Sequence, residues 1–466
     1  MPSTKLPPIP PDLERTRWTF RGGVHPPERK TFSEERAIER PALPPEVRLP
    51  LVMHAGAPAK PVVEKKAEVA RGQLVAEPAG FISAPIHAPV SGTVKDITPV
   101  WHPSGRMVPA IILATDAEAT AAAIEEEAAR TVAADHDISA LAPEAIVEAV
   151  KTAGIVGLGG AAFPSFVKLM RLPEKPIDFV LLNGSECEPY LTADHRMMLE
   201  RPAPILAGLR LAMRATGAER AAIAIEDNKP DAIETLRAAV REANVSERIE
   251  VAAVKSKYPQ GGERTLIPAV TRRAVPVGGF PPDIGVCILN VGTAAAIAQA
   301  VVYGAPLIER VVSLTGRGVR EPGNLLVPIG TPVSYLVEQR GGLTADAARV
   351  ILGGPMMGPT AAHLEIPILK GMSGITVMVA DEVRPRPEMP CIRCGRCVDA
   401  CPVDLMPALI GRYVAKRMID EALATHLMAC VECGTCSYVC PSSIPLVQYM
   451  RSGKFLARKL QQQQKQ

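Results

Sequence analysis

Short apolar runs alternate with amphipathic stretches through the middle of the chain, from about residue 136 to residue 310. The apolar runs have the length of buried strands, and the amphipathic stretches place apolar residues at helical spacing. This alternation predicts an α/β domain with a largely parallel sheet. The expected strands lie at 177–184, 219–227, 248–254 and 285–293, and the expected helices at 203–217, 231–244 and 293–304.

Two other segments have the pattern of small β domains. Residues 51–115 contain valines two or three positions apart, with turn residues at Gly72 and at Ser91-Gly92. This segment resembles the biotinyl/lipoyl barrel, but the stretch between its two halves, AEPAGFISAPIHAPV, contains no lysine that could carry a cofactor. We therefore expect a packing or docking role. Residues 311–380 return to short strands with glycine turns, which predicts a small β-rich module.

The segments that flank these domains are rich in proline or charge. Residues 1–50 predict extended chain lying on other domains, with a disordered leader as the alternative. Residues 116–136 predict a charged connecting helix, and the proline-rich 381–390 predicts a linker. For the basic segment 446–466 two alternatives are open, contact with anionic lipid or a partner subunit, and a solvated helix end. Its cations are Arg451, Lys454, Arg458, Lys459 and Lys465.

Composition narrows the class of protein. The chain has 466 residues, which is enough for several domains, and its net charge of +3 is too small to argue for nucleic acid as a partner. The N-terminus has no apolar core of a secretory signal, and the most apolar long window is interrupted by Pro306, Glu309 and Arg310. These features predict a soluble or peripherally attached protein.

Cysteines are concentrated near the C-terminus, with eight of the ten between residues 391 and 440. They form two runs of the pattern C-x2-C-x2-C-x3-C-P, which is the run of bacterial ferredoxins with two [4Fe–4S] clusters. In such proteins the fourth cysteine of each run binds the other cluster. The alternative, a pair of zinc sites, does not need this doubled pattern. The first predicted cluster has Cys391, Cys394, Cys397 and Cys440 as ligands, and the second has Cys430, Cys433, Cys436 and Cys401.

The remaining histidines and cysteines give weaker signals. Apolar residues recur at helical spacing between the two cysteine runs, which predicts a helical connection. Cys287 lies in an apolar strand and is expected to be buried, and Cys187 has no paired histidine base. His54, His87 and His102 are scattered through the predicted barrel without paired spacing, so we interpret them as surface or turn residues.

Two iron–sulfur clusters transfer single electrons, so a partner that exchanges electron pairs for single electrons is expected, and a flavin does this. The stretch GLGGAAFP, residues 157–164, is the candidate for its phosphate. It lacks Rossmann or Walker spacing, and alone it would be a flexible turn. Lys168 on the following helical stretch, together with free amides at the helix start, favours a bound phosphate.

Four motifs then resemble the NADH-binding subunit of respiratory complex I, and they occur in the same order there. They are GLGGAAFPSFVK, NGSECEP, GGERT and NVGT. Together with GGVHPP, LLNGSECEPYLTADHRMMLE and YPQGGERTLI, they make nearly all of residues 20–445 similar to the C-subunit family of the Rnf electron-transport complex. Leu158, Ser185 and Arg264 depart from the complex I motifs, which leaves the NADH contacts less well defined than the flavin contacts.

The resemblance implies a multidomain α/β plus β fold, with its domains in a fixed order. A leader (1–50) and a barrel-sandwich domain without a carrier lysine (51–115) precede an FMN/NADH-binding α/β domain (136–310). A β-grasp-like SLBB module (311–380), a helical ferredoxin domain with two [4Fe–4S] clusters (386–445) and a basic tail (446–466) follow.

The resemblance also implies the residues of the flavin and nucleotide sites. The phosphate of a non-covalent FMN is expected at Gly157, Gly159, Gly160 and Lys168. The ribityl chain and ring edges are expected at Asn183, Ser185 and Glu186, and the pocket is expected to be closed by Gly262, Glu263, Asn290 and Thr293. Phe163 is expected to stack on NADH and Glu188 to bind its ribose hydroxyls.

The implied function is that of a peripheral subunit of a membrane NADH:ferredoxin oxidoreductase. Hydride would pass from NADH to FMN without a covalent catalyst, and single electrons would pass through the two clusters. The implied partners are NAD(H) and the integral membrane and ferredoxin-like subunits of the complex, at the cytoplasmic face of the bacterial inner membrane. Two alternatives remain: a soluble flavin and iron–sulfur cobalamin reductase, and an electron-conducting scaffold that binds no NADH.

Overall fold

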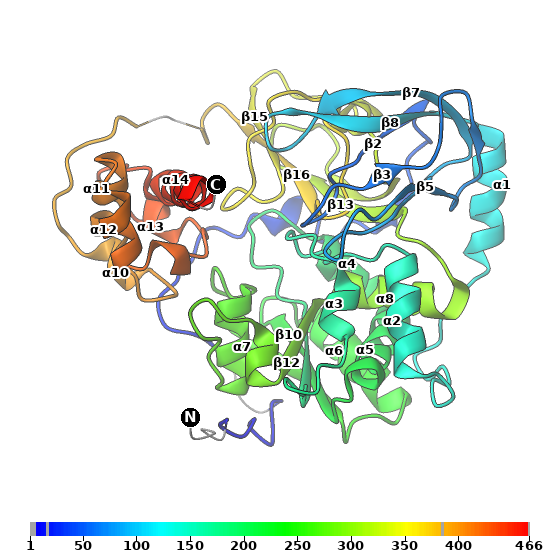
Figure 1. The fold of residues 1–466 in the computed structure, drawn as a ribbon, viewed down its shortest axis with the longest axis horizontal. Coiled ribbons are helices and arrows are strands. Elements are labelled where there is room, and N and C mark those ends of the chain that lie inside the picture. The colour runs from blue at the N-terminus through cyan, green and yellow to red at the C-terminus, as the bar shows by residue number, and fades with distance from the viewer. Residues whose placement is uncertain (1–5, 15–17, 384–385, 465–466) are drawn as a thin grey trace.

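The computed structural model describes residues 6–14, 18–383 and 386–464, and it consists of four packed parts (Figure 1). The cysteine-rich part, with α10 to α14, stands at one end of the molecule, and the N-terminal segment runs between it and the α/β domain. The barrel and the β-rich module lie together above the α/β domain in this view. The C-terminal helix therefore belongs to the cysteine-rich part, and the N-terminal segment contacts several parts.

The α/β domain is built on a parallel sheet of four strands in the order β11-β10-β9-β12, at the positions that the apolar runs predict. Alternate residues point to opposite faces, so each face has its own apolar core. The core of one face contains Leu181 and Ile288 together with Leu266, and that of the other contains Leu182 and Leu289 together with Leu206. The strands are β9 (Phe179–Asn183), β10 (Arg220–Glu226), β11 (Ile249–Val254) and β12 (Val286–Asn290).

The helices of this domain begin and end where local chemistry favours it. The longest, α5, has Pro202 in its first turn, where a missing N–H costs nothing, and ends at Gly217 with φ +85°. Leu266 of α7 and the N-terminal Leu13 and Trp18 cover one face of the sheet. The helices are α2 (Pro143–Thr152), α3 (Ser165–Leu169), α4 (Ala193–Glu200), α5 (Pro202–Thr216), α6 (Pro230–Glu242), α7 (Glu263–Thr271) and α8 (Val291–Tyr303), with a 3₁₀ turn η2 (Pro281–Ile284).

The barrel is formed by two antiparallel sheets, of order β2-β8-β7-β4 and β3-β5-β6. Its edge strand β2 comes from residues that the sequence pattern places in the leader. The strands are β2 (Glu46–Pro50), β3 (Lys60–Pro61), β4 (Glu68–Val69), β5 (Leu74–Glu77), β6 (Ile86–His87), β7 (Gly92–Trp101) and β8 (Met107–Thr115), and α1 (Ala117–Ala128) follows as the connecting helix.

The interpretation of the barrel histidines as surface or turn residues is wrong for two of them. His54 is 6% exposed and accepts a hydrogen bond from the Ala84 N–H at 3.0 Å, and His87 is 9% exposed. Burial lowers the pKa of both rings, that of His87 to about 4. Both rings lie near the buried Lys370, which comes from the β-rich module and has no pattern of its own in the sequence.

The β-rich module has a five-stranded sheet of order β1-β14-β13-β16-β15 and one helix that the pattern does not predict. The leader supplies its edge strand, β1, which pairs in parallel with β14. Its elements are β1 (Ile38–Glu39), β13 (Glu309–Thr315), β14 (Gly323–Pro328), α9 (Val333–Gln339), β15 (Ala347–Leu352) and β16 (Gly374–Val379), and the 3₁₀ turn η1 (Lys30–Phe32) precedes β1.

The cysteine-rich part consists of short helices that pack against one long C-terminal helix. Met450 and Ala457 of that helix are buried, so residues 446–464 belong to this part, and Lys465 lies outside the described residues. No helix among the described residues is long and apolar enough to span a membrane. The elements are α10 (Arg396–Asp399), α11 (Pro407–Ala415), α12 (Ile419–Ala424), η3 (Leu427–Ala429), α13 (Thr435–Tyr438) and α14 (Leu446–Gln464).

Candidate functional site

The carboxyl edge of the parallel sheet brings the predicted glycine loop next to two strand ends. The strands β9 and β12 pair in parallel and end at Asn183 and Asn290, which are paired in register. The Leu158 N–H donates to Thr293 Oγ1 at 2.9 Å, which fastens the loop to the first turn of α8. Asn290 caps the same helix, because its Oδ1 accepts from the Gly292 and Thr293 amides.

Within the glycine loop, two glycines stand where a side chain would fill space next to the sheet edge. A Cβ on Gly159 would lie 3.5 Å from the Asn290 Cβ. Gly160 has φ +107° and has no heavy atom within 4 Å of the position of a Cβ. Lys168 of α3 donates from Nζ to the Ile288 carbonyl at 3.1 Å, and the same Nζ lies 3.9 Å from a carboxylate oxygen of Glu263. The loop therefore borders open space with a cation close to the adjoining strand.

Unpartnered polar groups lie on the other side of this edge. Asn183 donates from Nδ2 to the Gly261 carbonyl at 2.8 Å and accepts the Ser185 N–H at 3.1 Å. Ser185 is fully buried, and its hydroxyl has no hydrogen-bond partner among the described residues. The same holds for both polar atoms of the Gln260 amide. Because buried polar groups are nearly always paired, these atoms fit a polar ligand such as a ribityl chain or flavin ring edge.

Glu186 holds the start of a helix. Its carboxylate accepts the Asp194 N–H at 2.7 Å and the His195 N–H at 3.1 Å, in the first turn of α4. Asp194 in turn accepts a hydrogen bond from Asn290 Nδ2. Burial raises the pKa of Asp194 to about 7, with the charge of Glu186 acting in the same direction. This acidic pair links α4 with the end of β12.

Two buried lysines fix the loop that carries Ser185 and Glu186. Lys229 donates from Nζ to the Ser185 carbonyl at 2.7 Å, and Lys30 donates to the Glu186 carbonyl at 2.8 Å and the Leu191 carbonyl at 2.7 Å. Burial lowers the pKa of Lys30. The loop is therefore held by cations from α6 and from the leader, and its backbone shape is set before any ligand is bound.

The two residues predicted to contact NADH, Glu188 and Phe163, differ in their surroundings. The Glu188 carboxylate accepts the Met356 N–H at 3.0 Å and the Met357 N–H at 2.9 Å, which ties the loop to the β-rich module. Burial raises its pKa to about 7. Phe163 is half-buried, and its carbonyl accepts the Gly157 N–H at 2.8 Å. Gly262 precedes Glu263, the first residue of α7, so that pair stands at a helix start.

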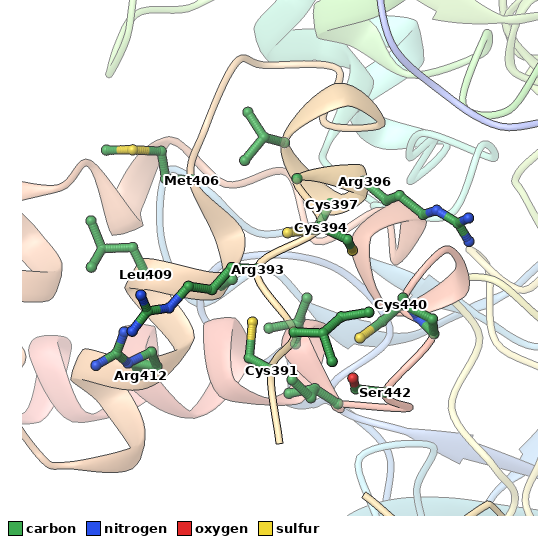
Figure 2. Close-up of a pocket in the computed structure, with 17 residues that line it drawn as sticks. Cys391, Arg393, Cys394, Arg396, Cys397, Met406, Leu409, Arg412, Cys440 and Ser442 are labelled. Atoms are coloured by element: carbon green, nitrogen blue, oxygen red, sulfur yellow. The ribbon is translucent and has the colours of Figure 1, made fainter. Parts of the chain in front are cut away.

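The first cysteine cavity has a volume of about 260 Å³ and is lined by the four cysteines predicted to hold one cluster. Figure 2 shows the sulfur atoms of Cys391, Cys394, Cys397 and Cys440 around one space. Cys391 and Cys394 are exposed. The chain thus places the fourth cysteine of the second run beside the first three of the first run.

The second cavity, of about 20 Å³, is lined by the other four cysteines, Cys401, Cys430, Cys433 and Cys436. Burial raises the pKa of the Cys430 thiol to about 11 and of the Cys436 thiol to about 12. Binding of a cluster as thiolates would therefore release protons near neutral pH.

The cysteine pattern distinguishes a zinc site from an iron–sulfur cluster site. Four thiolates on one zinc ion lie about 3.8 Å apart, since the Zn–S distance is about 2.3 Å in a tetrahedron. Among the described residues, no three His, Cys, Asp or Glu side chains are grouped closely enough to hold one ion. The doubled C-x2-C-x2-C-x3-C-P pattern is that of ligands to two [4Fe–4S] clusters.

Comparison with known protein families covers each part in turn. Residues 18–118 match the RnfC barrel sandwich hybrid domain, 150–299 the Nuo51 FMN-binding domain, 311–360 the SLBB domain and 390–444 the 4Fe-4S dicluster domain. The chain is 42% identical over 403 residues to the C subunit of the Na(+)-translocating ferredoxin:NAD(+) oxidoreductase complex of Acetobacterium woodii, covering 86% of this chain and 89% of that protein.

The chain belongs to the C-subunit family of ion-translocating oxidoreductase complexes. It is also 42% identical over 435 residues to the C subunit of the ion-translocating oxidoreductase complex of Rhodobacter capsulatus, covering 92% of this chain and 82% of that protein. An NAD+-reducing [NiFe]-hydrogenase in the H2-reduced state is a structural neighbour at 21% identity, with a TM-score of 0.49, covering 71% of this chain and 63% of that chain. The family and the fold class expected from the sequence are confirmed, as are FMN and two [4Fe–4S] clusters as cofactors.

One contact between the two sites of this family member has no signal in the sequence pattern. The Tyr258 hydroxyl donates to the Cys433 carbonyl at 2.7 Å, and the phenol ring is 1% exposed. Only two residues separate Tyr258 from Gly261, whose carbonyl accepts from Asn183. The segment 258–261 therefore joins the sheet edge to the second cysteine cavity.

Proposed function

We propose that this chain carries electrons between NAD(H) and a ferredoxin-type partner, as a peripheral subunit of an ion-translocating membrane complex. The relatives' names support it, because they describe ferredoxin:NAD(+) oxidoreductases that translocate ions. The integral membrane and ferredoxin-like subunits are its partners, and its position is the cytoplasmic face of the membrane. The observation that carries the proposal is the segment 258–261, which contacts both the candidate flavin pocket and the second cysteine cavity.

In this proposal the glycine loop at the sheet edge would hold the FMN. Gly157, Gly159 and Gly160 leave room for the phosphate, and Lys168 supplies a cation beside it. The unpartnered Ser185 hydroxyl and the Asn183 amide would hold the ribityl chain. Glu186, Gly262, Glu263, Asn290 and Thr293 shape the pocket through helix starts and backbone contacts.

Bound FMN supplies the exchange between an electron pair and single electrons. The chain's own residues orient it and exclude water from it. For NADH we propose Phe163, half-buried at the glycine loop, and Glu188. Because the Glu188 carboxylate already accepts two backbone N–H groups, it contacts ribose hydroxyls only as an additional acceptor.

For the clusters we propose the two sets of four cysteines that line the two cavities. Of the two sets, the one that contacts the flavin-pocket segment 258–261 is the second, because the Tyr258 hydroxyl donates to the Cys433 carbonyl. The second set is Cys401, Cys430, Cys433 and Cys436.

Anaerobic purification followed by visible spectra before and after NADH tests the function. We expect flavin and iron–sulfur absorbance that both bleach on addition of NADH. Protein that contains both clusters but no FMN, and whose clusters do not bleach with NADH, would instead be an electron-conducting scaffold. A chain that does not copurify with integral membrane flavoproteins would contradict the assignment to a membrane complex.

The first prediction concerns Lys168. Replacement by Glu puts a negative charge where the phosphate would bind, so Lys168→Glu is expected to lower FMN content by at least about tenfold, which corresponds to about 1.4 kcal/mol of binding free energy. Iron content should stay that of the wild type, because Lys168 contacts neither cysteine cavity. Lys151→Glu, on the exposed side of α2, is the matched control and should retain FMN. Loss of iron with unchanged FMN content in Lys168→Glu would contradict the assignment of Lys168 to the FMN phosphate.

A further inference from the structure

The two cysteine cavities differ in what covers them. The second is enclosed, with Cys401, Cys433 and Cys436 all 8% exposed or less, and it faces the α/β domain through Tyr258. At the first cavity, Cys391 and Cys394 are exposed. The first cavity therefore lies closer to solvent, and a cluster bound there is the one from which an electron can pass to another protein.

Apolar side chains stand exposed at the mouth of the first cavity. Ile392 is 68% exposed, Met406 49% and Val398 41%, and all three line the cavity. Exposed apolar groups gathered around one opening mark a contact surface more often than scattered ones do.

Three arginines surround the same mouth. Figure 2 shows the guanidinium groups of Arg393 and Arg412 on one side of the four sulfur atoms and that of Arg396 on the other. Among the described residues none of the three forms an ion pair, and the cavity lining contains no acidic side chain. By contrast, the second cavity has an acidic lining residue, Glu432, whose charge is met by Lys454.

We propose that this arginine-rimmed face, formed by Ile392, Val398, Met406, Arg393, Arg396 and Arg412, docks an acidic electron-carrier protein with its redox centre near its own surface. The proposal rests on the proposed function and identifies the place where single electrons cross to the partner. In each crossing the partner's centre gains one electron and the first cluster of this chain loses one, and no bond is made or broken.

The chemistry of the face favours this occupant over two others. A second copy docked by a twofold axis would place the same unpaired arginines against one another, which is repulsive. An anionic membrane is favoured by an amphipathic helix face, whereas the exposed apolar side chains here are three residues that line a cavity, together with three arginines. Unpaired arginines around an apolar centre are typical of transient, electrostatically steered protein contacts.

The test measures binding of a plant-type [2Fe–2S] ferredoxin, an acidic protein, to the cluster-loaded full chain by isothermal titration calorimetry. We expect binding that weakens by at least about tenfold when NaCl is raised from about 20 to about 200 mM, because the Debye length shortens. Arg393→Glu/Arg396→Glu/Arg412→Glu is expected to weaken binding by at least about thirtyfold. Arg458→Glu, exposed on α14 and outside both cavities, should bind like the wild type.

A variant with one substitution is included because the triple variant could fail to assemble its clusters. Arg412 lies on α11, outside the cysteine runs, so Arg412→Glu is expected to retain iron and to weaken binding by about fivefold. Absence of ferredoxin binding by the wild type, or equal binding by the triple variant, would overturn the proposal. Two further results would overturn it. One is a wild-type dimer in sedimentation velocity that is absent in the triple variant. The other is wild-type binding to phosphatidylglycerol vesicles that the triple variant does not show.

Calorimetry needs neither NADH nor FMN, so the two proposals can fail separately. If NADH does not bleach the wild-type flavin, the proposed function fails while the docking result stands. If NADH bleaches flavin and clusters but ferredoxin does not bind, the docking proposal fails alone.

Discussion

Lys454 places a positive charge against the backbone of the second cysteine run. It is 7% exposed, and its Nζ donates to the Cys430 carbonyl and, at 2.9 Å, to a carboxylate oxygen of Glu432. The basic C-terminal segment is therefore neither a free helix end at this residue nor available to lipid there. A cation near a cluster stabilises its reduced, more negative state.

The second prediction follows from this charge. Lys454→Met retains the buried stem but removes the cation, and we expect the reduction potential of the second cluster to fall by on the order of 50 mV. An EPR-monitored redox titration measures it. Arg458→Met is the control and should leave both potentials unchanged. A shift confined to the cluster predicted to be bound by Cys391, Cys394, Cys397 and Cys440 would contradict the ligand assignment.

Lys370 is buried where three parts of the molecule meet. Its Nζ donates to the carbonyls of Pro85 in the barrel and Gly154 in the α/β domain, both at 2.8 Å. Burial lowers its pKa from 10.5 to about 7. Among its titratable neighbours, burial lowers the pKa values of His54 and His87, so both rings are neutral between pH 7 and 9, and it lowers the pKa of Arg310 to about 10.

The third prediction concerns the pH dependence of stability. Between pH 7 and 9 the unfolded state keeps the proton on this lysine and the folded state loses it, so the free energy of unfolding rises with pH. The wild type is expected to gain on the order of 2 kcal/mol over this range relative to Lys370→Met. Urea unfolding followed by the fluorescence of Trp101, in a Trp18→Phe background, measures the difference. Equal pH slopes in the two proteins would show that Lys370 is charged in the fold.

At the scale of elements, the segment 22–24 acts as a strap between two parts. The Gly23 N–H donates to the Ala400 carbonyl at 3.0 Å, and the Val24 N–H donates to the Tyr258 carbonyl at 2.8 Å. Gly22 has φ +78°, and a Cβ there would lie 2.8 Å from the Cys401 carbonyl oxygen. Only glycine tolerates both the left-handed backbone and this close approach.

The fourth prediction is that Gly22→Val loosens this strap. The clash moves the strap away from Cys401, so electron transfer from reduced flavin to the clusters should slow by about tenfold or more. Flavin reduction by NADH should be unchanged, because Gly22 lies outside the candidate flavin pocket. Stopped-flow absorbance follows the two steps separately, and Gly105→Val, at an open turn in the barrel, is the control. Equal slowing of both steps would argue against a strap.

The sequence predicts elements well where one periodicity dominates. All four apolar runs of the α/β domain are strands of one parallel sheet, because both of their faces are buried and their residues form two cores. The pattern does not reveal strands whose partners are distant. Ile38 and Glu39 form β1 only because β14 lies beside them, and Glu46–Pro50 form an edge of the barrel through β8.

At the scale of the molecule, three hydrogen bonds between described residues hold the cysteine-rich part against the rest. They are Gly23 with Ala400, Tyr258 with Cys433, and the Arg451 guanidinium, which donates to the Met357 carbonyl at 3.2 Å. Apolar packing joins them, with Val24, Tyr258, Ala400 and Cys433 in one core cluster. The two parts therefore meet by surfaces as well as through the covalent linker.

The fifth prediction tests this contact. If a protease site is placed at Pro387 in the linker and the folded, cluster-loaded protein is cut, the two pieces should still co-elute in size-exclusion chromatography. The same cut in the Gly22→Val protein should yield pieces that already separate at a protein concentration at which the wild-type pieces stay together. Immediate separation of the wild-type pieces would show that the linker alone holds them together.

For the site, as for the fold, the sequence predicts the local features and not the contacts between distant residues. Cysteine spacing in each run is local, and the sequence predicts both sets of four that the fold gathers, although their role as ligands stays a prediction. The glycine loop and the strand ends are also visible as motifs. The residues that fix the site are not visible as motifs, because Lys30, Lys229 and Tyr258 act through hydrogen bonds to backbone carbonyls that are distant in the sequence, and no spacing records such contacts.

The strap has a consequence for synthesis on the ribosome. Gly23 is made early, yet its carbonyl partner, Ala400, belongs to a segment that emerges near the end of translation. At about 5–20 residues per second the two are separated by roughly 20 to 75 s. During that interval the Gly23 N–H lacks its carbonyl partner while Val24 can already pair with Tyr258, and the last domain to be made closes over one of the first segments.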